Sequence, residues 1–256
     1  MTSTSNGQLT VVGLGPGPDN WVTPAATDAV NRAQDLLGYI PYLNRIADKE
    51  GQTKHPSDNR EEIARAKHAL DLAASGRRVV VVSGGDPGVF AMATAVCEAI
   101  DKGPKNWRNI DIHIEPGVTA MLAAAARIGA PLGHDFAVIS LSDILKPWRI
   151  IEKRLRLTSQ ADLAIALYNP ASKTRKEQIQ RAFDVLRQTR SLDTPVVLAK
   201  SVGRSNETII LTTLDKTDVS QIDMRTLVIV GSTGTRIVDR PGLCPLVYTE
   251  RFVEET

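Results

Sequence analysis

Short apolar runs that end in turn residues alternate with segments of helical periodicity along the first half of the chain. The apolar runs predict strands over residues 9–14, 36–37, 78–83, 110–114 and 136–141. The segments between them predict helices over residues 25–34, 61–74, 91–100 and 120–127. Strands that alternate with helices in this way usually form a mostly parallel sheet, so we expect an α/β fold.

The second half of the chain has fewer helices for each strand. Helices are predicted over residues 148–157 and 176–190, and strands over residues 163–167, 196–200, 208–211 and 227–230. Strands that follow one another without a helix favour antiparallel pairing. We place the boundary near residues 142–147, which divides the chain into an N-terminal domain, 1–141, and a C-terminal domain, 142–256.

Composition narrows the class of protein. A hydrophobic share of 42% and a charged share of 23% describe a globular protein, and a net charge of +2 is too small to indicate a nucleic-acid partner. No apolar run reaches the length of a membrane span, and the first residues do not resemble a signal peptide. The two cysteines, Cys97 and Cys244, are far apart in sequence and have no metal-ligand spacing. We therefore expect a cytoplasmic protein that binds neither membrane, nucleic acid nor metal.

The strand predicted over residues 78–83 ends in the loop Ser83-Gly84-Gly85-Asp86-Pro87-Gly88. Ligands of open α/β sheets bind beyond such strand ends, and glycines let the backbone approach a ligand closely. Asp86 can accept hydrogen bonds from hydroxyl or amino groups. Because the loop has no Lys or Arg, a neutral or cationic nucleoside fits it better than a phosphate does. A plain tight turn is the simpler alternative.

Other motifs in the sequence do not indicate a dinucleotide site, a metal site or a catalytic nucleophile. Residues 13–17 resemble a dinucleotide loop, but Pro16 and Pro18 remove backbone donors and the glycine spacing is GxGxG. His113 and Glu115 match half of a zinc deaminase signature whose cysteine pair is absent. The sequence shows no nucleophile elbow and no Walker loop. Methyl transfer from a sulfonium donor needs none of these groups, only close and well-oriented reactants.

Four segments taken together resemble the tetrapyrrole methylase family. They are residues 12–17 (VGLGPG), 83–87 (SGGDP), 115–120 (EPGVTA) and 167–170 (LYNP), in the family's order and across most of the chain. The resemblance implies a class III methyltransferase of two α/β domains. It also implies a cleft between them for S-adenosyl-L-methionine, S-adenosyl-L-homocysteine as product, and a homodimer.

The resemblance also implies which residues bind the cofactor. Tyr168 and Asn169 stand where many relatives have Tyr-Met, so Asn169 departs from the family pattern. The full set of implied cofactor residues is Pro16, Gly84, Gly85, Asp86, Val89, Phe90, Thr119, Ala120, Tyr168, Asn169, Ser201, Val202 and Gly203.

Residues 38–42 (GYIPY) and 167–175 (LYNPASKTR) resemble one branch of the family. That branch methylates C17 of precorrin-3B and contracts the ring to precorrin-4 in cobalamin (vitamin B12) and porphyrin-type biosynthesis. Some relatives have an Asp where this chain has Ile40, so a carboxylate base is missing there. Candidate proton donors or acceptors are Tyr39, Asp143, His134 and Lys200, although Tyr39 could equally well pack at a strand end.

A tetrapyrrole substrate carries many carboxylates, which need cationic partners. Candidates near predicted strand ends or turns are Arg45, Lys173, Arg175 and Arg204, unless they are solvated surface charges. Several alternatives stay open: another precorrin, a cobalt-loaded substrate, a diphthine-type protein substrate, or a nucleoside-binding module without turnover.

Overall fold

The computed structural model describes residues 7–58, 61–172, 175 and 177–252. The chain divides into two compact units, Met1–Thr119 and Ala120–Thr256. The predicted boundary after Leu141 is therefore too late. The reason is that α5 (Ala120–Ile128) packs against the second sheet, and β7 (Phe136–Ser140) is a strand of that sheet.

The first unit contains a five-stranded sheet in which every strand is parallel to its neighbours, as the pattern predicts. The strand order is β3 (Thr53–Ser57), β2 (Asp35–Tyr39), β4 (Arg78–Ser83), β1 (Gln8–Gly13) and β5 (Asp111–Glu115). The helices are α1 (Pro24–Arg32), α2 (Ile40–Leu43), α3 (Glu62–Ala74) and α4 (Met92–Lys102). Strand β3 and helix α2 escape sequence reasoning because both are short and contain a proline.

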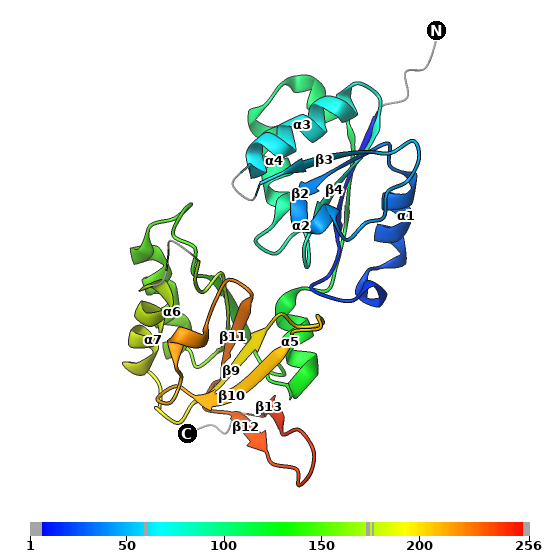
Figure 1. Cartoon of the computed structure of the whole chain (residues 1–256). Coiled ribbons are helices and arrows are strands. Elements are labelled where there is room, and N and C mark those ends of the chain that lie inside the picture. Colours follow the sequence, from blue (N-terminus) through cyan, green and yellow to red (C-terminus); the bar gives the residue numbers. More distant parts are fainter. Residues whose placement is uncertain (1–6, 59–60, 173–174, 176, 253–256) are drawn as a thin grey trace. The chain divides into compact units, whose positions relative to one another are not determined.

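Helices α3 and α4 cover one face of this sheet, and α1 lies on the other (Figure 1). The four valines of β4 point alternately to the two faces of the sheet. Val79 and Val81 pack with α3 and α4, whereas Val80 and Val82 pack with α1. This is why the strand reads as a continuous apolar run rather than as an alternating one.

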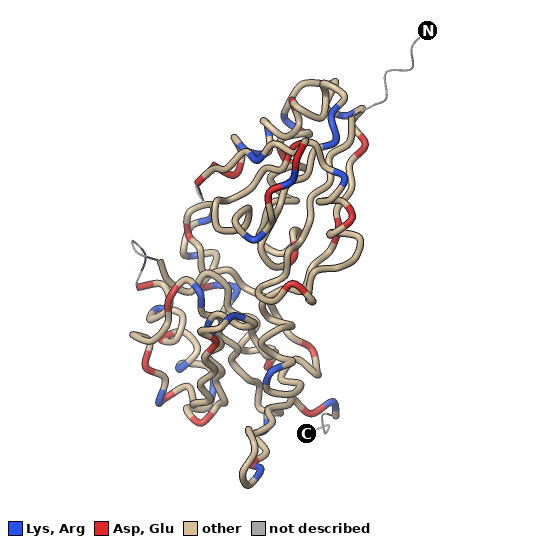
Figure 2. Tube along the Cα trace, turned by 45° about the vertical axis from the view of Figure 1, so that its right-hand side comes forward, with Lys and Arg blue, Asp and Glu red and all other residues tan. Residues whose placement is uncertain are grey.

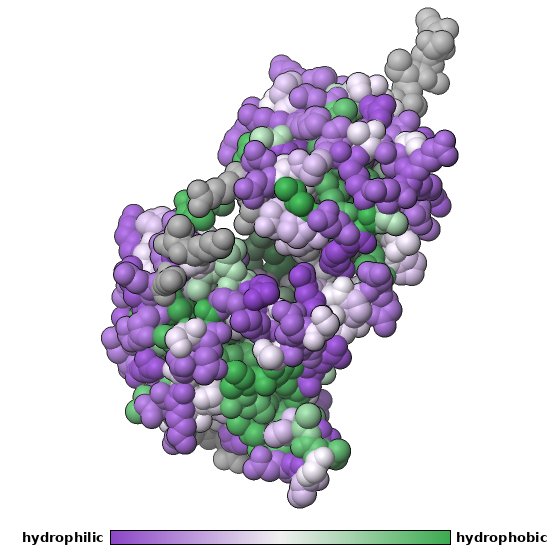
Figure 3. Space-filling model, viewed as in Figure 1, coloured by the Kyte–Doolittle hydropathy of each residue, from purple (hydrophilic) through white to green (hydrophobic). Residues whose placement is uncertain are grey.

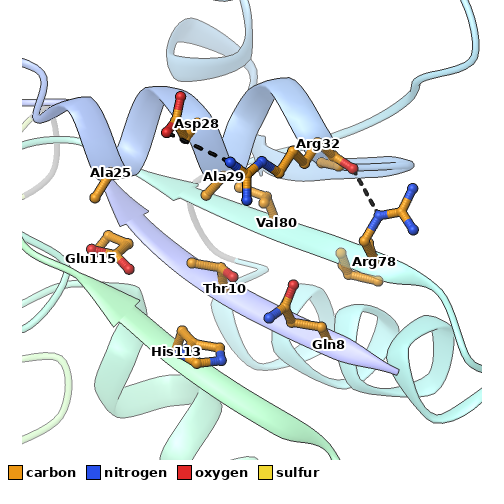
Figure 4. Close-up of a pocket in the computed structure, with 12 residues that line it drawn as sticks. Gln8, Thr10, Ala25, Asp28, Ala29, Arg32, Arg78, Val80, His113 and Glu115 are labelled. Carbon is orange, nitrogen blue, oxygen red and sulfur yellow. Dashed lines mark hydrogen bonds and ion pairs between the residues drawn. The ribbon is translucent and has the colours of Figure 1, made fainter. Parts of the chain in front are cut away.

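Strand β5 lies at the sheet edge, and its face on the α1 side is open. A cavity of about 310 Å³ there is lined by α1, β1 and β5, with Thr10, His113 and Glu115 among its walls (Figure 4). Ile112 packs against the core on the opposite face, whereas Ile114 is exposed, so the alternating pattern of this edge strand marks a buried face only at Ile112. None of the predicted site residues lines this cavity.

The second unit has a mixed five-stranded sheet. Its order is β10 (Thr208–Thr213), β9 (Pro195–Lys200), β11 (Thr226–Val230), β8 (Ala164–Tyr168) and β7. Only β7 and β8 pair in parallel, which confirms the predicted antiparallel pairs. Helices α6 (Trp148–Gln160) and α7 (Glu177–Arg187) enclose a core around Phe183. A small sheet of β12 (Thr235–Val238), β13 (Leu246–Thr249) and β6 (Gly129–Ala130) was not predicted, because its strands are very short.

Acidic and basic residues are interspersed along the described chain of each unit, without a block of one sign (Figure 2). Among the described residues, no helix is both long and apolar enough to cross a membrane.

Candidate active site

Three loops meet at the carboxyl edge of the first sheet, after β1, β4 and β5. Their backbones approach so closely that side chains are excluded. A Cβ on Gly13 would lie 2.5 Å from the carbonyl oxygen of Gly85, and a Cβ on Gly117 would lie 2.3 Å from the same oxygen. Gly15 and Gly85 exchange two backbone hydrogen bonds, of 3.2 and 3.1 Å, and both have positive φ. The amide of Gly15 in the GxGxG loop therefore already donates to the loop after β4. It is not available to the phosphates of a dinucleotide.

Asp86 organises this edge. One carboxylate oxygen accepts from the amide of Gly88 at 2.8 Å, and the other accepts from the amide of Gly117 at 3.0 Å. The carboxylate therefore joins the loop after β4 to the loop after β5, and its remaining lone pairs are available to a ligand. Sequence reasoning assigned Asp86 to the site but not Gly13 or Gly117, although Gly13 is the last residue of β1 and Gly117 lies two residues after the end of β5.

Backbone strain coincides with the predicted cofactor residues. Among the described residues, four other than glycine have positive φ: Phe90, Asp162, Asn169 and Ser201, at 52–54°. Three of them are predicted cofactor residues, and each follows a different strand: β4, β8 and β9. Such conformations cost about 1–3 kcal/mol each and concentrate at functional sites.

Strands β7, β8 and β9 of the second sheet end at one edge, because β11 runs antiparallel to both β8 and β9. Asn169 donates from its side-chain amide to the hydroxyl of Ser140 at 2.9 Å. The hydroxyl of Ser201 is buried and has no hydrogen-bond partner. It is therefore a candidate ligand contact. Ser140 was missed by sequence reasoning, since nothing marks it before the strands are aligned.

Tyr168 has a supporting contact. Its hydroxyl accepts from the backbone amide of Met121 at 2.9 Å, in the first turn of α5. The first amides of a helix have no partner within the helix, so this contact satisfies one of them. It also fixes the neighbouring Ala120 relative to the end of β8.

The structure brings Asp143 and Arg175 together, and Gln178 of α7 also contacts Asp143. Gln178 donates to one oxygen of Asp143 at 2.9 Å, and Nη1 of Arg175 lies 3.8 Å from the other. Nη1 of Arg175 and Oε1 of Gln178 are both buried without a hydrogen-bond partner. The cluster therefore offers one unused donor and one unused acceptor. Gln178 was not predicted, because on α7 it reads as an ordinary polar helix residue.

The other proton-transfer candidates do not gather around this cluster. Lys200 forms a 2.8 Å ion pair with Asp223. Burial raises the pKa of Asp223, but hydrogen bonds from Lys200 and from the amide of Arg225 hold that pKa below its ordinary value. His134 precedes β7 and so lies at the amino edge of the sheet, opposite Asp143. Tyr39 ends β2 in the first unit, with its ring edge-on to Tyr42 at 5.4 Å.

The predicted substrate cations have different surroundings. Arg45 donates to the carbonyl oxygens of Leu14, Gly15 and Gly17 at 2.6, 2.9 and 2.8 Å. It therefore holds the GxGxG loop in place, and its predicted contact with substrate stays a prediction. Arg204 is exposed in the turn after β9. Lys173 lies outside the described residues.

The remaining predicted residues surround these contacts. Pro16, Gly84 and Val89 are half-buried in the first unit's loops, and Thr119 is buried. In the second unit, Val202 is buried and Gly203 has positive φ. Within the described part of the chain, no group of three or more His, Cys, Asp or Glu side chains could hold a metal ion.

Comparisons with known proteins show the family to which this chain belongs. Residues 8–218 match the family Tetrapyrrole (Corrin/Porphyrin) Methylases. The chain is 55% identical over 246 residues to a precorrin-3B C(17)-methyltransferase from Sinorhizobium sp, which covers 96% of this chain and 97% of that protein.

Two solved structures show the same fold. The crystal structure of the methyltransferase CobJ superposes with a TM-score of 0.91 at 50% identity, over 95% of this chain and 100% of that one. A uroporphyrin-III C-methyl transferase from Thermus thermophilus, in complex with S-adenosyl homocysteine, has a TM-score of 0.65 at 20% identity. It covers 88% of this chain and 97% of its own, and shows the fold alone. The chain belongs to the tetrapyrrole (corrin/porphyrin) methylases, a family of methyltransferases.

Proposed function

We propose that this chain transfers a methyl group from S-adenosyl-L-methionine to C17 of precorrin-3B, with ring contraction to precorrin-4 and release of S-adenosyl-L-homocysteine. The observation that carries the proposal is the 55% identity, over nearly the whole of both chains, to a protein named for this activity. The exposed free thiols of Cys97 and Cys244 fit a reducing compartment, and we propose that the enzyme works in the cytoplasm.

The residues at the two strand-end edges fit such a cofactor. S-adenosyl-L-methionine supplies a methyl group that its sulfonium charge already activates. The backbone wall of Gly13, Gly85 and Gly117 would allow close approach, and Asp86 would accept from ligand hydroxyl or amino groups. In the second unit, the unused hydroxyl of Ser201 and the amide of Asn169 would contact the nucleoside.

Substrate carboxylates would meet cations of the second unit. Arg175 has an unpartnered donor, and Arg204 is exposed near the end of β9. Asp143 lies beside Arg175, so we propose it as the acceptor for the proton that ring contraction must move. Lys200 is the weaker candidate, because Asp223 already pairs with its ammonium group.

The test is anaerobic incubation of the purified protein with S-adenosyl-L-methionine and precorrin-3B, followed by mass spectrometry. A product heavier by one methyl group, with a ring-contracted spectrum, is expected. Methylation of a different tetrapyrrole or of a protein instead would overturn the assignment. Parallel incubation with the cobalt-loaded substrate shows which of the two forms reacts faster.

We also propose a homodimer. Figure 3 shows an apolar area on the second unit, over the region of β9, β10, β12 and β13. Exposed apolar side chains on three of these strands are Ile210, Ile237, Val238, Leu246 and Tyr248. Contiguous apolar surface of this kind usually marks an interface. Light scattering should give twice the 27.8 kDa of one chain, and a mass of one chain at all concentrations would exclude the dimer.

A further inference from the structure

Arg65 is a buried cation on α3 that forms no ion pair with a carboxylate of the described residues. Its relative exposure is 5%, and among the described residues no acidic side chain lies within ion-pair distance of it. Buried arginines normally have such a partner, because removing a charge from water is costly. Burial lowers the pKa of its guanidinium, opposed by Glu62 and Glu61 at longer range. An apolar side chain at this position would avoid that cost.

The guanidinium instead joins three segments through uncharged acceptors. Nε donates to the hydroxyl of Ser57 at 2.7 Å, and Nη2 donates to the carbonyl oxygen of Asp58 at 2.7 Å. Nη1 donates to the sulfur of Met92 at 3.2 Å. The planar fork of arginine fixes the directions of all three bonds at once, which a lysine cannot do.

These acceptors lie at the ligand edge of the first unit. Ser57 is the last residue of β3 and Met92 the first of α4, two positions after the strained Phe90. The hydroxyl of Ser57 in turn reaches the carbonyl oxygen of Gly38, the neighbour of Tyr39, at 3.4 Å. Arg65 therefore ties the far end of the loop 84–91 to the ends of β2 and β3.

We propose that Arg65 is a positioning residue for the loop 84–91, acting through Met92 to hold Phe90 and the Gly84–Asp86 turn in the conformation that binds the cofactor. The proposal rests on the proposed function, because it takes S-adenosyl-L-methionine as the ligand of this loop. Arg65 itself is too buried to contact the ligand, so its effect passes through the backbone.

The test compares Arg65→Met with Arg77→Met. The Arg65 variant keeps apolar packing against Met92 and loses the three hydrogen bonds. Arg77 pairs with the buried Asp35 at the amino edge of the same sheet, so its variant destabilises the unit away from the loop. Calorimetric titration with S-adenosyl-L-homocysteine and thermal unfolding are measured for both.

We expect Arg65→Met to lower the affinity about tenfold, whereas Arg77→Met lowers the unfolding temperature and leaves the affinity within about twofold of the parent protein. Arg65→Lys keeps the charge without the fork, and should recover at most a small part of the affinity. In turnover, KM for S-adenosyl-L-methionine should rise more than kcat falls.

Parent-like affinity in Arg65→Met would overturn the inference, as would affinity losses in both variants that simply follow their loss of stability. If Arg65→Met does not fold, the affinity of Arg65→Lys is the test. Parent-like affinity in Arg65→Lys would show that the loop does not need the three hydrogen bonds of the guanidinium. Failure of the parent protein to bind S-adenosyl-L-homocysteine would instead refute the proposed function.

Discussion

The two units present strand-end edges that are built in different ways. In the first unit, the edge is a wall of backbone, in which Gly13 and Gly117 have no room for a Cβ and Gly85 has the positive φ that favours glycine. In the second unit, side chains make the edge, through Asn169 on Ser140 and the Asp143 cluster. A backbone wall takes its shape from sequence positions that must lack a Cβ. An edge of side chains depends on which groups are present, and tolerates small changes of shape.

The difference suggests a division of labour. The glycine wall suits the part of the reaction that is common to all substrates of such an enzyme, namely cofactor binding. Within the side-chain edge, the unused donor of Arg175 and the unused acceptor of Gln178 suit selection between substrates, whereas Asn169 and Ser201 are the proposed cofactor contacts of that edge. Substitutions of the wall glycines Gly13 and Gly117 should therefore abolish binding, whereas substitutions of side chains at either edge should weaken it by degrees.

The largest effect should come from Gly117→Ala. Its Cβ would lie 2.3 Å from the carbonyl oxygen of Gly85 and 2.9 Å from Cα of Gly13, so backbone must move. We expect S-adenosyl-L-homocysteine binding to fall below detection by calorimetry, and the free energy of unfolding to fall by about 1–3 kcal/mol from overpacking. Gly51→Ala is the control: it has positive φ but no neighbour within 4 Å. The Gly51→Ala protein should lose stability and keep its affinity for S-adenosyl-L-homocysteine. If the Gly117→Ala protein still binds this ligand, the idea of a backbone wall is contradicted.

Asp86→Ala should have the next largest effect. The substitution leaves the part-buried amide of Gly117 without its acceptor, which costs about 1–3 kcal/mol, whereas the exposed amide of Gly88 can turn to water. Weaker binding of S-adenosyl-L-homocysteine and earlier thermal unfolding should appear together. Unchanged affinity would remove Asp86 from the site.

The sequence was sufficient to predict the longer strands and single residues of both edges, but not the contacts between residues that build the edges. A continuous run such as Val79–Val82 and a loop such as Gly84-Gly85-Asp86 are local signals, readable without knowing what lies nearby. The Asp143 cluster joins a loop to a helix 35 positions away through Gln178, and no local pattern reports that pairing. Nor does any local pattern report that Arg45 donates to three carbonyl oxygens of the loop after β1, some 30 positions earlier in the chain.

Ser201 offers a smaller and sharper test of the second edge. Ser201→Gly removes the hydroxyl and relieves the positive φ of 52°, whereas Ser201→Ala removes the hydroxyl and keeps the strain. If the hydroxyl contacts the cofactor, both variants should lose about fivefold in affinity for S-adenosyl-L-homocysteine. Both variants remove a buried, unpartnered hydroxyl, and Ser201→Gly should be more stable than Ser201→Ala by about 0.5–1 kcal/mol because it also relieves the positive φ. Equal affinity of both variants and the parent would leave the hydroxyl without a ligand role.

The smallest expected effect is on stability at acidic pH, and it compares Asp35 of the first unit with Asp223 of the second. Burial raises the pKa of Asp35, but hydrogen bonds from Arg77 and His55 lower it below the ordinary 3.8. A lowered native pKa stabilises the fold above pH 3.8, and this contribution is lost as the pH falls through the native value. Acid unfolding followed by circular dichroism should be shallower in Asp35→Asn than in the parent. Asp223→Asn should change the slope less, because Asp223 is more exposed. If the parent and both variants unfold in acid with the same slope, neither carboxylate contributes to the pH dependence of stability.

The paired hydrogen bonds between Gly15 and Gly85 have a consequence for the timing of binding. They join two loops into one piece before any ligand arrives, so this part of the wall cannot be ordered by the ligand. Its entropy is already lost on folding, and the ligand does not bear that cost again. The amide protons of Gly15 and Gly85 should therefore exchange slowly with deuterated solvent in the empty protein, and S-adenosyl-L-homocysteine should slow them little further.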